Sequence, residues 1–312
     1  MKSKIILLAA LILVAACNKL DPASSPEPTV LRFKAEAPVP VNTKMTSEVD
    51  VDGLKFAWEN DDVLCLNFKY NGNYYPVDAA IDPSTISPSG KCAEFTVTLP
   101  SEIPSDATFD VFAIYQKDGS GRKWDPTTKN LFHFVSTEER GTTLNNPGSL
   151  GTSIMRPALG SEQKNVTAST LASFSLSHLG WVMCIHFRNE TTSDINAPEE
   201  IRFSSTESNL FADEYDWPSG PVLGHPVCSV LVQKEFGGSG SPWAGTKIAS
   251  WDEQVYYRWI CSDNSLPKLH VAVYPPNSSQ SRSTDLPART VTPGNVYHVY
   301  LNWETTKLTT GK

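Results

Sequence analysis

The sequence predicts an all-β protein, and three observations support this fold class. Apolar residues recur at every second position in several short runs, as in Leu64, Leu66 and Phe68, where Asn67 and Lys69 hold the other parity. Residues that form turns interrupt the runs about every ten residues. Beyond the N-terminal segment, no long stretch has the 3.6-residue period of an amphipathic helix. Many short strands with frequent turns are typical of β-sandwiches and barrels.

Further strands follow from the same alternation. Phe109, Val111 and Ala113 share one parity, and the segments 269–274 and 297–303 repeat the pattern near the C-terminus. Asn71-Gly72 predicts a tight hairpin, because both residues tolerate a positive φ. The dipeptides at 52–53 and 118–119, both Asp-Gly, are expected to form turns of the same kind.

One long β-run, residues 173–187, changes parity within itself. Phe174 and Leu176 share one face, whereas Trp181 and Met183 fall on the other parity. A slip of one residue predicts a bulge or bend near Ser177-His178. Burial of both faces would produce the same pattern.

The length of the chain and its composition indicate two domains. The stretch 141–168 alternates weakly and is broken by Gly, Asn and Pro, so we expect the boundary there. This gives an N-terminal β-sandwich at residues 31–160 and a C-terminal β-sandwich at residues 161–312. The second begins with the long run described above.

The N-terminus predicts export and lipid attachment. Lys2 and Lys4 precede an apolar run over residues 5–16, which is too short to span a bilayer and is typical of a secretory signal. Val14-Ala15-Ala16-Cys17 resembles the lipobox of bacterial lipoproteins, in which the cysteine becomes the lipidated N-terminus. The alternative is an ordinary signal peptide that ends near a cysteine. Residues 17–30, rich in Pro and Ser, then form a tether.

Charge and cysteine content narrow the possible partners. The net charge of −8, with no basic cluster, argues against nucleic acid. Apart from the lipid on Cys17, no cofactor is expected. Five cysteines remain, an odd number with no compact spacing, so we favour small buried residues over a disulfide framework. They are Cys65, Cys92, Cys184, Cys228 and Cys261.

No catalytic or metal-binding motif is complete. His225 and Cys228 have zinc-like spacing but lack two further ligands at matching spacing. His178 and His186 lie too far apart on one extended strand to share a metal. We therefore predict no metal site and no enzyme. A hydrolase would need acidic residues that only the fold could bring together.

Tryptophans between residues 217 and 259 suggest a second type of function. Exposed indole rings can stack on sugar faces. Trp217 and Trp243 adjoin prolines in turn-like segments, and Trp251 belongs to the same cluster, so these three are candidate ligand-stacking residues. Tyr257 and Trp259 are expected in the core.

Three segments together resemble the fimbrillin family of Bacteroidales, the lipoprotein subunits and anchors of surface fimbriae. The first, residues 55–63 (KFAWENDDV), is similar to the family's Trp followed by an acidic turn and a strand, with Asn60 where Gly is usual. The second, residues 153–158 followed by 174–179, is similar to its mid-chain Met segment and His-Leu strand. The third, residues 291–299, is similar to its final Pro-Gly turn and Tyr strand.

The resemblance implies two transthyretin-like, Ig-like sandwiches and a role as stalk, tip or anchor at the outer membrane. Stalk subunits of the family lose an N-terminal strand by proteolysis and receive a strand from a neighbour, which satisfies an open sheet edge. Lys34 or Lys44 could be such a cut site, next to the first expected strand at residues 31–37. Arg32 lies at the start of that strand and no Arg follows it in the next loop, so an uncleaved accessory or anchor role is an equal alternative. Other fimbrial subunits are the expected partners. The alternative is a glycan-binding surface lipoprotein that uses the tryptophans above.

Overall fold

The predicted all-β class is confirmed by the computed structural model. The structure describes residues 28–38, 49–50, 53–54, 56–116, 124–134, 142–144, 157–206, 209–231, 247–276 and 280–311. Within these ranges one short 3-10 turn, Pro83–Thr85, is the only helical element, and all others are strands. No helix in the described part of the chain is long and apolar enough to cross a membrane. The signal segment, the cysteine Cys17 and the tether up to residue 27 lie outside the described residues.

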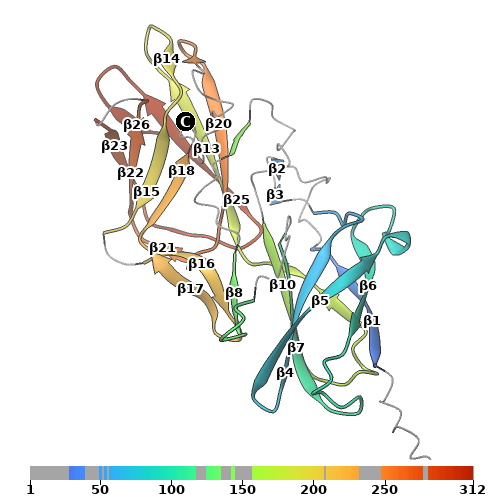
Figure 1. Ribbon diagram of the computed structural model, residues 1–312. Coiled ribbons are helices and arrows are strands. Elements are labelled where there is room, and N and C mark those ends of the chain that lie inside the picture. The colour runs from blue at the N-terminus through green and yellow to red at the C-terminus, as the bar shows by residue number, and fades with distance from the viewer. Residues whose placement is uncertain are drawn as a thin grey trace, which may run out of the picture.

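The strands form two bodies (Figure 1). The first body is an eight-stranded sheet in the order β11-β1-β6-β5-β4-β7-β10-β12. Its strands are β1 (Val30–Glu36), β4 (Val63–Tyr70), β5 (Asn73–Asp82), β6 (Cys92–Thr98), β7 (Phe109–Gln116), β10 (Ala158–Val166), β11 (Ser173–Ser175) and β12 (Ser177–His178). The two outermost strands, β11 and β12, are consecutive in the chain, so residues 173–178 join both ends of the sheet. The sheet therefore folds over onto its own core.

The second body is a sandwich of two sheets. One has the order β26-β25-β13-β20-β9, and the other has the order β18-β15-β22-β23. The first comprises β26 (Leu308–Thr310), β25 (Val296–Trp303), β13 (Trp181–Asn189), β20 (Glu253–Ile260) and β9 (Thr142–Leu144). The second comprises β18 (Val227–Leu231), β15 (Glu200–Ser204), β22 (Leu269–Tyr274) and β23 (Arg282–Leu286). Ile185 and Leu301 of one sheet share a buried core with Phe203 and Val271 of the other.

Smaller sheets complete the molecule. A three-stranded sheet pairs β17 (Gly220–His225), β16 (Phe211–Asp216) and β8 (Leu131–His133). Three short pairs are β14 (Ile195–Asn196) with β19 (Lys247–Ile248), β2 (Val49–Asp50) with β3 (Gly53–Leu54), and β21 (Ser265–Leu266) with β24 (Arg289–Thr290).

A third apolar cluster joins the two bodies. Phe112 and Ile114, from the outer face of the first body's sheet, pack in one buried cluster with Trp217 of the three-stranded sheet and with Val182 and Trp259 of the sandwich. Phe112 stacks on Trp217, with ring centroids 5.8 Å apart and 18° between the ring planes. The contact explains why β4 and β7 are buried on both faces.

The predicted hairpin is confirmed. Asn71 and Gly72 have φ values of 48° and 78°, and Tyr70 pairs with Asn73 across the turn between β4 and β5. At residues 52–53 the strands flanking Asp-Gly pair as Asp50 with Gly53, while Asp52 itself lies outside the described residues. The second Asp-Gly, at 118–119, also lies outside them.

The parity change in residues 173–187 coincides with the predicted bend, which lies directly after His178, and no bulge is needed to explain it. Phe174 and Leu176 belong to the core of the first body, whereas Trp181 and Met183 belong to the core of the second. The chain thus passes from one body to the other at Leu179-Gly180. Sheet membership also differs from the expected division at residue 160, because β10 to β12 belong to the first body and β8 and β9 pair with strands of later sheets.

Candidate functional site: strand β1 and its groove

Strand β1 alternates strictly between the core and the solvent. Leu31, Phe33 and Ala35 are 3%, 2% and 0% exposed, while Arg32 and Lys34 between them point outward. The Phe33 ring contacts two aromatic rings of the core, stacked on Phe95 at 6.1 Å and edge-on to Phe174 at 5.1 Å. Apolar side chains at every second position match the pleat of a strand, which is why this short segment fits a single register.

The backbone of β1 is paired on both sides. It is antiparallel to β6 over seven residue pairs, from Val30–Thr98 to Glu36–Cys92. On the other side it is parallel to β11 over three pairs, beginning with Lys34–Ser173. Two bonds flank the parallel stretch, from Lys34 N to the Ala172 carbonyl at 3.0 Å and from Leu176 N to the Glu36 carbonyl at 2.9 Å. Over residues 34–36, β1 therefore fills a slot between two strands, whereas residues 30–33 pair with β6 alone among the described strands.

Trp58 binds the same strand from within the core. Its indole Nε1 donates a hydrogen bond to the Ala35 carbonyl at 3.2 Å, and the residue is 3% exposed. The ring packs edge-on against Phe56, Phe95 and Tyr115. The Trp of the segment at 55–63 is thus a contact between the core and the backbone of β1.

The acidic turn after Trp58 is held by buried polar contacts. Asp62, 8% exposed, accepts a hydrogen bond from the Tyr115 hydroxyl at 2.6 Å and another from the backbone N of Glu59 at 2.7 Å. Burial, followed by the charge of Asp62 and the hydrogen bond to it, raises the pKa of Tyr115 far above its usual range, so the phenol stays protonated and donates. This arrangement fixes the start of β4 and the position of the Trp58 ring.

The closed sheet determines how another strand could enter the first body. Residues 173–178 cover both ends of this sheet, because they pair with β1 through β11 and with β10 through β12. A strand from another chain can enter at the position of β1 only if β1 leaves. The vacated groove would expose the core residues that β1 now covers, including Phe95 and Phe174.

The two candidate cut sites have different outcomes. Lys34 lies inside β1 and is paired on both sides, so the folded chain does not present it as an extended substrate. Arg32 is likewise within β1, paired with Thr96. Lys44 lies outside the described residues. Cleavage that releases β1 from this fold would therefore have to fall beyond Pro38, the last described residue after the strand.

Two of the segments that resemble fimbrillins meet where the bodies join. His178, at the end of β12, lies against Gly294 of the Pro-Gly turn, so that a Cβ at this glycine would fall 2.8 Å from the imidazole Cδ2. Gly294 has a φ of +86°. Its backbone N donates to the Gly180 carbonyl at 2.8 Å, and Val182 N donates to the Asn295 carbonyl at 2.9 Å. The mid-chain segment at 153–156 lies outside the described residues.

Comparison with known proteins gives structural neighbours only. A scan against protein-family models finds no match, and a search of curated proteins finds none either. Solved structures similar to this chain include a candidate cell adhesion protein from Bacteroides ovatus, with 13% identity and a TM-score of 0.45 over 90% of this chain and 95% of that one. Another from Bacteroides uniformis has 12% identity and a TM-score of 0.44 over 91% and 97%. A fimbrial assembly protein from Parabacteroides distasonis has 11% identity and a TM-score of 0.39 over 89% and 93%.

The structure separates the three candidate ligand-stacking tryptophans. The prediction for Trp217 is wrong, because this residue is 2% exposed. Its ring stacks on Phe112 and packs edge-on against Tyr74, and its Nε1 donates to Glu162 at 2.8 Å. The neighbouring proline does place Trp217 in a turn, but its indole faces the first body and is therefore not exposed. Trp243 lies outside the described residues. Trp259 is buried, as expected for a core residue.

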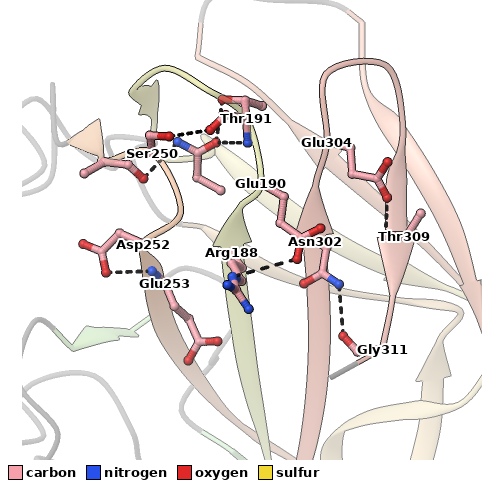
Figure 2. A network of polar contacts seen from close by, with 12 residues as sticks. Arg188, Glu190, Thr191, Ser250, Asp252, Glu253, Asn302, Glu304, Thr309 and Gly311 are labelled. Atoms are coloured by element: carbon pink, nitrogen blue, oxygen red, sulfur yellow. Dashed lines mark hydrogen bonds and ion pairs between the residues drawn. The ribbon is translucent and has the colours of Figure 1, made fainter.

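Trp251 is 57% exposed and sits on a well-braced turn. Its φ is +64°, and its backbone N donates to the Asn189 carbonyl at 2.8 Å. Asn189 is fully buried and donates to the carbonyls of Ile248 and Ala249. Next to it, Ser250 donates to the Thr191 carbonyl at 2.6 Å (Figure 2). The turn before β20 lies at the opposite end of the second body from the β16–β17 hairpin, whose turn contains Trp217 (Figure 1).

The structure does not bring together the His225–Cys228 pair that was considered as a metal site from the sequence, but it forms a different group. The five described cysteines form no disulfide with one another, and four of them are buried. His225 pairs with Asp213 at 2.6 Å, while Cys228 points into the core of the sandwich, so these two do not converge. The structure instead brings Cys184, His186 and His298 together on the outer face of the five-stranded sheet. Only the Cys-x-His spacing on one strand hinted at this group, because His298 is 112 residues away from His186.

Proposed function

We propose that this chain is a non-enzymatic surface lipoprotein that takes part in fimbriae or a related adhesive assembly, and that it joins a neighbouring subunit by strand exchange at the position of β1. The observation that carries the proposal is the slot that β1 occupies. The strand inserts Leu31, Phe33 and Ala35 into the core and is paired on both sides. The segments that resemble fimbrillins favour the same role.

Occupation of this slot by a strand is strongly favoured. Burial of Leu31 and Phe33 contributes on the order of 3–6 kcal/mol by area. If β1 left, these contacts would be lost and the backbone groups of β6 and β11 that face it would be unpaired. A donated strand restores both kinds of contact, provided that it carries two large apolar residues and then a small one at alternate positions. The last position must be small because the Ala35 side chain is fully buried and its carbonyl accepts a hydrogen bond from the Trp58 indole.

The test separates β1 from the body covalently. A recognition sequence for a specific protease is inserted directly after Pro38, and the purified protein is cleaved and then incubated with a fluorescent peptide of residues 28–38. We expect the cleaved protein to incorporate the peptide and to release its own N-terminal fragment, while the uncleaved protein incorporates none. Incorporation is measured by size-exclusion chromatography with fluorescence detection.

Two variant peptides test whether incorporation depends on the buried side chains of β1. In the variant Phe33→Asp, a charge replaces the ring that contacts Phe95 and Phe174, so incorporation should fail. A second peptide, Arg32→Ala, changes an outward side chain and should be incorporated like the parent. Equal incorporation of the Phe33→Asp and parent peptides, or none of the parent peptide by the cleaved protein, would contradict the proposal.

Lipid attachment at Cys17 is the proposed means of anchoring to the outer membrane. Each buried methylene contributes about 0.8 kcal/mol, so two or more acyl chains on one residue give stable attachment. Mass spectrometry of the N-terminal peptide from native membranes should show Cys17 as the acylated first residue. A Cys17→Ser variant should leave the membrane fraction.

A second candidate function, glycan binding, rests on Trp251. This indole is exposed on a turn that Asn189 braces, which is the arrangement expected of a ring that stacks on a sugar face. If it binds glycans, Trp251→Ala should abolish retention on a glycan array without changing the melting temperature. If this variant is retained on the array as well as the parent, glycan binding through Trp251 is excluded and assembly remains as the proposed function.

A further inference from the structure

The outer face of the five-stranded sheet carries a cluster of metal-ligating side chains. Cys184 and His186 stand two residues apart on β13, and His298 stands on the parallel neighbour β25, directly opposite Cys184 in the register. The ligand atoms of all three lie within 4.8 Å of one another. His186 Nε2 is 2.8 Å from His298 Nδ1 and 3.4 Å from Cys184 Sγ.

We propose that Cys184, His186 and His298 form a zinc-binding site, with Zn²⁺ held by one thiolate sulfur and two imidazole nitrogens. Zn²⁺ takes sulfur and nitrogen ligands at about 2.3 Å and 2.0–2.1 Å in tetrahedral geometry. Those lengths place two nitrogen ligands about 3.3 Å apart and a sulfur and a nitrogen about 3.5 Å apart. The observed 3.4 Å between sulfur and nitrogen already fits, and the two imidazoles need to separate by only about half an ångström.

The surroundings of His186 are those of a metal ligand. Its Nδ1 lies 2.8 Å from Glu253 Oε1, so that when this nitrogen carries the proton, the lone pair of Nε2 points at the other two ligands. A carboxylate behind a ligating histidine fixes its tautomer and increases its basicity. The Tyr300 ring stacks on His186 with centroids 4.5 Å apart, which restricts rotation of the imidazole.

The proton balance of binding follows from the same contacts. Burial raises the pKa of the Cys184 thiol to about 12, so it is protonated in the metal-free protein. Zn²⁺ would displace this proton, and His298 would move its own proton from Nδ1 to Nε2 to free a lone pair. One proton is therefore released for each metal bound.

These three side chains leave a fourth tetrahedral position for water or another ligand. The cluster lies on the face of the sheet opposite the sandwich core, where His186 has 17% of its side chain exposed. The metal would tie β13 to β25 across the sheet, far in sequence from β1. This inference does not depend on the function proposed for the strand slot.

The test uses the full-length protein, purified in mild detergent under reducing conditions and stripped of metal with a chelator. Zinc chloride is titrated by calorimetry, and cobalt chloride is titrated by absorbance. We expect one metal per chain, a thiolate-to-cobalt charge-transfer band and the release of one proton. His298→Gln should weaken zinc binding by more than about 100-fold, and Glu253→Gln by about 10- to 100-fold, the usual effect of removing a carboxylate behind a ligand.

Two matched variants control for the loss of a thiol or a histidine elsewhere. Cys261→Ser removes a buried thiol outside the cluster, and His270→Gln removes a strand histidine that pairs with Asp285. Both should bind zinc like the parent, whereas Cys184→Ser should lose the charge-transfer band. A parent protein without that band, or a His298→Gln variant that binds zinc as tightly as the parent, would overturn the inference. His298→Gln alters a partly exposed side chain, and near-ultraviolet circular dichroism verifies that it folds.

Discussion

The indole nitrogen of Trp58 donates to the backbone carbonyl of Ala35 at 3.2 Å, which links the most prominent motif of the sequence to the strand that we propose is exchanged. Trp58→Phe keeps an aromatic ring but removes the donor and leaves a buried carbonyl with one partner fewer. We expect the free energy of unfolding to fall by about 1 kcal/mol or somewhat more, measured by urea denaturation. Trp251→Phe, at an exposed position, should change it by less than about 0.5 kcal/mol. If the two variants change the free energy of unfolding equally, the hydrogen bond from Trp58 does not stabilise β1.

The second prediction concerns the anchor of β1. Phe33→Ala removes a ring that is 2% exposed and contacts two other aromatic rings, so we expect a loss of about 3–5 kcal/mol. Hydrogen exchange should show the amides of β1 becoming unprotected before those of β4. Val30→Ala, in the same strand but 54% exposed, serves as the control and should change little. If the amides of β1 and β4 lose protection together, β1 does not detach separately from the rest of the sheet.

The sequence predicted the parts of the fold that depend on neighbouring residues. Alternation located the strands at 64–70 and 109–113, and the positive φ values of Asn71 and Gly72 follow from residue chemistry alone. Alternation does not reveal that Cys65 and Ile114 are covered by the second body, because this burial depends on contacts between segments far apart in the sequence.

The site was predictable to a similar extent. The strand at 31–37 and the Trp of residue 58 were recognisable, but the slot between β6 and β11 exists only because residues 173–178 close the sheet. Trp217 was misjudged for the same reason, since its surroundings come from Tyr74 and Phe112 of the first body. The group of Cys184, His186 and His298 depends on the parallel pairing of β13 with β25, which no local pattern encodes.

The third prediction concerns the junction between the bodies. Gly294→Ala places a Cβ 2.8 Å from the His178 ring at a φ of +86°, so it adds a clash to the backbone strain. Gly72→Ala is the matched control, because its φ is +78° but no atom lies within 4 Å of the new Cβ. We expect about 1 kcal/mol of destabilisation at Gly72 and clearly more, by about 1–3 kcal/mol, at Gly294. The difference between the two variants in free energy of unfolding, measured by urea denaturation, reports the contact with His178. If the two variants are equally stable, the junction accommodates the added methyl group without loss of stability.

The last prediction concerns pH. Burial, and secondarily the positive charge of Lys91, lowers the pKa of His178 to about 4 from its usual 6.5. The unfolded chain therefore binds this proton more readily than the folded chain, so the contribution of His178 to stability is complete above about pH 6.5 and is lost as the pH falls toward 4. A difference of this size corresponds to about 3 kcal/mol at most.

His178→Gln tests this, because glutamine cannot take up the proton. The parent should lose stability between pH 7 and pH 4.5, measured by urea denaturation at each pH, and the variant should lose less over the same interval. The carboxylates of Asp82, Asp125 and Asp285, whose pKa values lie below the usual range, titrate at lower pH and are common to both proteins. Parallel pH profiles for the parent and the variant would show that the imidazole against Gly294 is protonated in the folded protein as easily as in the unfolded one.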